Sequence, residues 1–82
     1  MVRVDFSPKF QNTFKKIKDN LFETKVKKQI AKIIENPKIG KPMRNVRKGT
    51  RELYIPSFRL SYAYIKPEDK ITILDLYHKK FQ

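Results

Sequence analysis

Hydrophobic positions at the start of the chain alternate and then change to a helical spacing. Val2, Val4 and Phe6 follow a period of two, which predicts a short strand with one buried face. Ser7 and Pro8 are typical of a helix N-cap with proline at the first helical position, where its missing N–H costs nothing. We therefore expect a strand that leads directly into a helix.

Two apolar stripes at helical spacing follow, separated by Asp19-Asn20. The first stripe consists of Phe10, Phe14, Ile17 and Leu21, and the second of Phe22, Val26, Ile30, Ile33 and Ile34. The second run ends at Asn36-Pro37, because the residue before a proline is pushed out of the helical region. The pattern predicts two helices that a short turn joins into an antiparallel hairpin.

The second half of the chain returns to a period of two. Gly40, Pro42 and Gly49 first predict a loop that could include a turn of helix. Alternating apolar residues then predict three strands, around 53–55, 58–64 and 71–73, with short connections at Pro56-Ser57 and at residues 66–69. We expect an α+β fold, in which an N-terminal strand and the helical hairpin combine with a small antiparallel β-sheet and the helices cover one face.

Composition limits both the architecture and the chemistry. Residues 1–82 are enough for a single domain, and 39% hydrophobic and 12% aromatic residues can form its core. The absence of Cys excludes disulfides, thiolate nucleophiles and cysteine-based zinc sites, and one His cannot form a zinc site unaided. No stretch approaches the ~20 apolar residues of a membrane span, so we expect a soluble, cytoplasmic protein.

The net charge of +12 favours a polyanionic partner such as a nucleic acid or an acidic protein. Residues 9–51 contain fourteen Lys and Arg and three Asp and Glu, which accounts for +11 of that charge. Residues 38–51 have no acidic residue at all. The lysines on the helices are expected to be ordinary solvated residues. Arginine matches phosphate oxygens in pairs, so we predict nucleic-acid contacts here, at Arg44, Arg47, Lys48 and Arg51.

A carboxylate, a phenol and a guanidinium fall on one face of the predicted hairpin. If Pro56-Ser57 is a two-residue turn, Glu52 faces Ser61 and Tyr54 faces Arg59, and all four lie on the sheet face that the helices leave uncovered. The group is either a site or a plain salt bridge between Glu52 and Arg59, which would contribute roughly 0.2–1 kcal/mol.

The chain ends with its only imidazole, His78, beside Lys79 and Lys80, just beyond the last predicted strand. This His is either an exposed residue without a task or an acid or base that exchanges protons near neutral pH.

Several phrases in their order along the chain resemble the RelE/ParE superfamily of toxin–antitoxin toxins. They are Glu35-Asn36-Pro37 followed by Gly40-Lys41-Pro42, the string Phe58-Arg59-Leu60-Ser61-Tyr62, and the ending Leu76-Tyr77-His78-Lys79-Lys80. The resemblance implies a RelE-like fold, with a helical hairpin on an antiparallel sheet. It also implies a toxin that cuts mRNA in the ribosomal A site, where the 2′-hydroxyl of the RNA attacks the adjacent phosphate.

The resemblance implies a role for each matching residue and no cofactor or metal. Arg59 would stabilise the scissile phosphate, His78 would be the general acid and Lys79 a phosphate contact, and Glu52 is similar to the general base of YoeB-like toxins. Tyr54 and Glu52 fall where RelE has two lysines. Lys80 and Phe81 are candidates for contacts with the RNA.

The resemblance also implies partners, and other functions stay open. An acidic antitoxin would cover the basic surface, and a heterotetramer with it is one implied assembly, while the ribosome and mRNA would be the targets. The first alternative is a ParE-like toxin that inhibits DNA gyrase by binding. The second is a basic protein that binds nucleic acid without catalysis.

Overall fold

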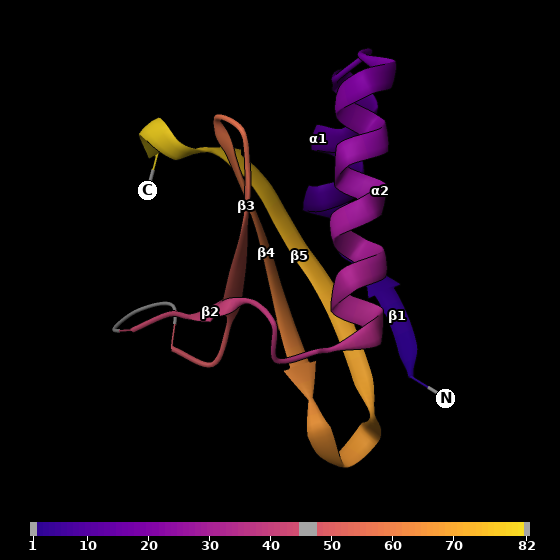
Figure 1. Ribbon diagram of the computed structural model, residues 1–82, viewed down its shortest axis with the longest axis vertical. Helices are drawn as coiled ribbons and strands as arrows, with labels where there is room; N and C mark the ends of the chain where they lie inside the picture. Colours follow the sequence, from indigo (N-terminus) through magenta and orange to yellow (C-terminus); the bar gives the residue numbers. More distant parts are fainter. Residues whose placement is uncertain (1, 45–47, 82) are drawn as a thin grey trace.

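The computed structural model describes residues 2–44 and 48–81, and for Phe81 the backbone only. Its elements are β1 (Arg3–Phe6), α1 (Pro8–Lys16), α2 (Asn20–Glu35), β2 (Lys41–Pro42), β3 (Arg51–Ile55), β4 (Phe58–Ile65) and β5 (Lys70–His78), with single turns of 3₁₀ helix at Lys66–Glu68 and Lys79–Phe81. The helices form one layer beside the sheet (Figure 1). The α+β prediction is confirmed, and β2 is an additional short strand inside the predicted loop.

The sheet has the strand order β1-β5-β4-β3-β2 and is mixed. Antiparallel pairing, as expected, holds for every pair except β1–β5, which is parallel. The two helices connect β1, at one edge of the sheet, to β2, at the opposite edge. The strands β3, β4 and β5 then follow one another back across the sheet, so that β5 lies beside β1. None of the described helices has the length and apolar character needed to cross a membrane.

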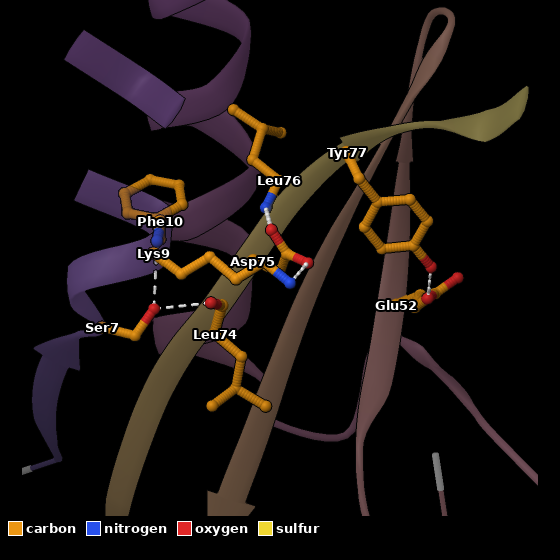
Figure 2. A network of polar contacts seen from close by, with 8 residues as sticks. All are labelled: Ser7, Lys9, Phe10, Glu52, Leu74, Asp75, Leu76 and Tyr77. Atoms are coloured by element: carbon orange, nitrogen blue, oxygen red, sulfur yellow. Dashed lines mark hydrogen bonds and ion pairs between the residues drawn. The ribbon is translucent and has the colours of Figure 1, made fainter. Parts of the chain in front are cut away.

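Both helices begin at side-chain caps. The Ser7 hydroxyl accepts a hydrogen bond from the Phe10 N–H (3.1 Å) and donates one to the Leu74 carbonyl (2.5 Å), which fixes the start of α1 to β5 (Figure 2). The Asp19 carboxylate accepts two hydrogen bonds from backbone N–H groups in the first turn of α2. Leu21 therefore belongs to α2, and its side chain is 66% exposed. The prediction that Leu21 is part of the first helix's apolar stripe against the core is wrong.

The core lies between the helix layer and one face of the sheet. Its buried side chains come from α1, α2 and the three central strands: Phe10, Val26, Ile33, Ile55, Leu60, Tyr62, Ile71, Ile73 and Leu76. The alternation predicted for β3 and β4 places their apolar residues on this face, so the opposite face is left without a helix.

A bulge in β5 decides which of its side chains share a face. Tyr62 of β4 pairs with Ile73, but the preceding Ser61 pairs with Asp75, so Leu74 is an extra residue in β5. Because side chains alternate along a strand, this extra residue moves every later position of β5 to the other face of the sheet.

The consequence of the bulge is seen in the last two residues of β5. Tyr77 pairs with Arg59 and lies on the helix-free face, whereas His78 pairs with Phe58 and lies on the helix side. Without the bulge the two side chains would exchange faces.

The connection from α2 to β2 is held against the sheet by Tyr62. The Tyr62 hydroxyl accepts a hydrogen bond from the Gly40 N–H (2.8 Å) and donates one to the Pro37 carbonyl (2.8 Å). Arg51 Nη1 donates to the Lys38 (3.1 Å) and Gly40 (2.8 Å) carbonyls. A Cβ atom on Gly40 would lie only 2.7 Å from the Tyr62 oxygen, so the close approach requires glycine.

Candidate functional site

The register of the β3–β4 hairpin is the predicted one. Glu52 pairs with Ser61 and Tyr54 with Arg59, across a turn in which Ser57 has φ 68°. These four residues lie on the helix-free face, as expected. The face is less open than predicted at one point, because Glu52 and Ser61 are only 6% and 5% exposed.

Glu52 is buried because a tyrosine from β5 reaches it. The Tyr77 hydroxyl donates a hydrogen bond to Glu52 Oε2, and Figure 2 shows the Tyr77 ring directed from β5 toward β3. A buried carboxylate needs such a donor to offset the loss of hydration. Tyr77 was not predicted as a site residue, because the bulge that brings it to this face was not predicted.

Arg59 is held beside the same carboxylate by its neighbour on β3. Its guanidinium carbon lies 4.6 Å from the centre of the Tyr54 ring, and its Nη1 donates to the Phe58 carbonyl (3.1 Å). Tyr54 itself is 55% exposed. Stacking on a ring orients the guanidinium while leaving most of its N–H groups for a ligand.

A pocket of about 350 Å³ joins these groups, and it is lined by Lys41, Met43, Glu52, Tyr54 and Arg59. Lys41 comes from β2, which pairs Lys41 with Glu52. Two cations and one carboxylate in a single pocket can bind an anionic group and exchange a proton with it. Lys41 and Met43 were not predicted, although Lys41 belongs to the phrase Gly40-Lys41-Pro42.

His78 lies apart from this pocket. It is the last residue of β5 rather than a residue beyond it, and it packs edge-on against Phe58 with ring centres 5.3 Å apart. Its Nδ1 accepts a hydrogen bond from the Lys80 N–H (3.2 Å). The expected convergence of His78 and Arg59 is not found, because the two side chains lie on opposite faces of the sheet.

His78 instead lines a second pocket, of about 510 Å³, at the edge of β5 beyond the end of β1. The other lining residues are Lys9, Thr13, Lys16, Ile17, Phe58, Asp75, Leu76 and Tyr77. Lys79 and Lys80 are exposed in the turn that follows. The side chain of Phe81 lies outside the described part of the structure.

The basic segment, residues 38–51, contributes exposed cations at its described positions. It also contains one arginine that holds the chain in place. Arg44 and Lys48 are exposed, and Arg47 lies outside the described residues. Arg51 is half-buried, and its hydrogen bonds to backbone carbonyls hold the segment in place. Within residues 2–44 and 48–81, no three or more His, Asp or Glu side chains gather in a way that could hold a metal ion.

The structure is similar to several solved toxins. The Escherichia coli RelE toxin in the intact RelBE complex superposes with a TM-score of 0.77 at 18% identity, over 95% of this chain and 96% of that chain. The Mycobacterium tuberculosis RelBE2 toxin–antitoxin complex gives 0.80 at 22% identity, over 94% and 96%. E. coli YafQ gives 0.78 at 18% identity, over 99% and 97%. These likenesses confirm the RelE-like fold.

Comparison with curated protein sequences gave no match. Residues 4–82, however, match the family model described as the ParE toxin of the type II toxin–antitoxin system parDE. The match spans nearly all of the chain, and it agrees with both the fold and the order of motifs. The chain therefore belongs to the ParE toxin family of the RelE/ParE superfamily, and it is a toxin of the type II toxin–antitoxin class.

Proposed function

We propose that this toxin cleaves mRNA on translating ribosomes, with the pocket around Glu52 and Arg59 as its active site. The observation that carries the proposal is the combination, on the helix-free face, of a buried carboxylate with two cations, Lys41 and Arg59. The implied cleavage needs a base for the 2′-hydroxyl, a cation for the phosphorane and an acid for the leaving oxygen. The pocket contains one group for each of these tasks.

In the proposed cleavage, the phosphoryl group is transferred from the 5′-oxygen to the 2′-oxygen. Glu52 takes the proton of the 2′-hydroxyl, and the 2′-oxygen forms a bond to the adjacent phosphorus. Arg59 stabilises the added negative charge on the phosphoryl oxygens. The bond to the 5′-oxygen breaks, and Lys41 gives that oxygen a proton. The products are a 2′,3′-cyclic phosphate and a 5′-hydroxyl end.

Tyr77 acts on this chemistry through Glu52, as a positioning residue. Its hydrogen bond to Oε2 fixes the carboxylate in one orientation. His78 has no part in the step, because it lies on the other face of the sheet.

Primer extension across a message translated in a purified system tests the proposal. The wild-type toxin should give cuts at codon-defined positions, and Arg59→Ala should reduce their rate by about 10²–10³-fold, as expected for loss of a charge-stabilising donor. Arg3→Ala, an exposed arginine on β1 at the far edge of the sheet, is the matched control and should cut at the wild-type rate.

His78→Gln separates this assignment from the role that the RelE resemblance gives to the imidazole. We expect cleavage within about threefold of wild type, which is small beside the 10²–10⁴-fold contribution of a general acid. A loss of that larger size in a folded variant would mean that His78 is catalytic and that the pocket is wrongly assigned. An absence of codon-positioned cuts with folded wild-type protein would exclude the nuclease.

Inhibition of DNA gyrase by binding is the second candidate. Two observations favour it: the family model is that of ParE, and His78 and Arg59 do not converge. A supercoiling assay distinguishes the two functions, since only a gyrase poison leaves broken DNA in the presence of gyrase.

A further inference from the structure

The strand β1 forms one edge of the sheet. It stands first in the strand order, beside β5, and Figure 1 shows it as the outermost strand on its side. The opposite edge is the two-residue strand β2, which contains Pro42. A very short edge strand with a proline resists pairing with a further strand. The edge available to another strand is therefore β1.

The main chain of β1 presents one residue, Val4, with both of its polar groups at this edge. The Arg3 N–H donates to the Asp69 carbonyl (3.0 Å), so the odd-numbered residues of β1 direct their backbone groups toward β5. Successive residues of a strand direct these groups to opposite sides, so those of Val4 and Phe6 point outward. The Phe6 carbonyl already accepts a hydrogen bond from Gln11 Nε2 (2.8 Å). Strand pairing at this edge therefore centres on Val4.

The side chains of β1 are complementary to those of a second, antiparallel copy of the same strand. Val4 lies between Arg3 and Asp5, and both charged side chains are exposed. When Val4 lies opposite Val4, Arg3 of each copy lies opposite Asp5 of the other. Such opposed residues have Cα atoms ~4.5 Å apart, which allows an ion pair. On the other face Phe6, which is 43% exposed, would lie opposite Val2.

We infer that two copies of this chain associate through β1, antiparallel about a twofold axis at Val4. The N–H of each Val4 donates to the carbonyl of the other. Val2 and Val4 face the core, so the two ion pairs between Arg3 and Asp5 lie on the helix-free face. Both copies use the same patch, and each has one such edge, so association stops at a dimer. The inference does not depend on the nuclease proposal.

Lys70 supports this arrangement from the neighbouring strand. Its ammonium group lies 3.0 Å from Asp5 Oδ2, and it holds the carboxylate on the face where Arg3 of the second copy would meet it. The net charge of +12 on each copy opposes association, so the dimer forms only at high protein concentration. The pocket around Glu52 is lined from β2, β3 and β4, away from β1, and stays open in the dimer.

Sedimentation equilibrium of the intact protein, in a concentration series up to about 1 mM, tests the inference. We expect a monomer–dimer equilibrium for the wild type. Asp5→Arg and Arg3→Asp each place like charges opposite one another, and each alone should weaken dimerisation by about tenfold or more. A 1:1 mixture of the two variants opposes Arg to Asp at every position and has the same total charge as two wild-type copies. It should associate within about threefold of the wild-type affinity.

Two exposed residues of α2 provide matched controls for net charge. Glu35→Lys and Lys27→Glu change the charge by the same amounts as Asp5→Arg and Arg3→Asp, respectively. Each should dimerise within about threefold of wild type, because distant charges are largely screened.

A disulfide tests the register directly, since the chain has no cysteine of its own. Val4→Cys should cross-link two copies under mild oxidation, because this pair of Cα atoms would lie ~5.5 Å apart. Thr24→Cys, at an exposed position on α2, should cross-link at least about tenfold more slowly. Wild-type protein that stays monomeric throughout the series, a variant mixture that fails to associate, or equal cross-linking at positions 4 and 24 would each overturn the inference.

Discussion

Replacing Tyr62 by phenylalanine tests the Tyr62 clamp, by which we mean the two hydrogen bonds that hold the α2–β2 connection against the sheet. The change removes only an oxygen atom, but that atom serves as acceptor for Gly40 and donor to Pro37 in a fully buried position. An orphaned buried N–H costs about 1–3 kcal/mol, and the lost bond to the carbonyl adds about 1 kcal/mol. We therefore expect the free energy of unfolding to fall by about 2–4 kcal/mol.

This loss is large beside the total stability of such a domain. At ~0.05–0.15 kcal/mol per residue, a chain of this length has about 4–12 kcal/mol in all. Urea unfolding followed by circular dichroism measures the change as a shift of the midpoint at constant slope. Hydrogen exchange should also become faster at Gly40 and Lys41, because the strand β2 loses its anchor.

Tyr64→Phe is the matched control, two residues away on the same strand. The Tyr64 hydroxyl donates to Asp69 Oδ1 (3.0 Å) at an exposed position, so its removal should cost at most about 1 kcal/mol. If the two variants lose the same stability, or Tyr62→Phe loses less than about 1 kcal/mol, the clamp does not contribute as the geometry indicates.

Two further predictions concern the same clamp. Gly40→Ala places a Cβ 2.7 Å from the Tyr62 oxygen and 3.0 Å from the Glu52 carbonyl oxygen. We expect the free energy of unfolding, measured in urea, to fall by about 1–3 kcal/mol. An unchanged midpoint would show that the connection moves freely. Burial raises the pKa of Tyr62 above its usual 10.0, so the folded chain holds that proton more tightly than the unfolded chain. This contribution to stability is complete below pH 10, and it is lost as the pH rises through the folded-state pKa. Tyr62→Phe should therefore show a shallower alkaline decline than wild type, and an identical slope would contradict the assignment.

The local parts of the fold could be predicted because short-range chemistry determines them. Ser7 and Pro8 mark the start of α1, and a two-residue turn at Pro56-Ser57 leaves one register for the β3–β4 hairpin. That register correctly placed Tyr54 and Arg59 together.

The last strand was predicted less well, because its pattern allows two ways of assigning its later side chains to the two faces of the sheet. Ile71 and Ile73 define one face, but both Leu74 and Leu76 are apolar, so the sequence does not reveal which of them the core receives. The structure places the bulge at Leu74 and buries Leu76. This single unpredicted residue brings Tyr77 to the face of Glu52 and Arg59. It also separates His78 from Arg59, which the family resemblance had implied would act together.

The parallel pairing of β1 with β5 has a consequence for synthesis. Val4 pairs with Ile71, and β5 lies between β1 and β4, so an interior position of the sheet is filled only after the other four strands have been made. A nascent chain that stops before Lys70 has the helices and the β3–β4 hairpin, but β1 is left without the neighbour it needs. Contacts this distant form late, because the ends of a long segment must first be brought together. Interrupted translation products should therefore be unfolded and inactive, and the cell meets a folded toxin only after His78 has been added.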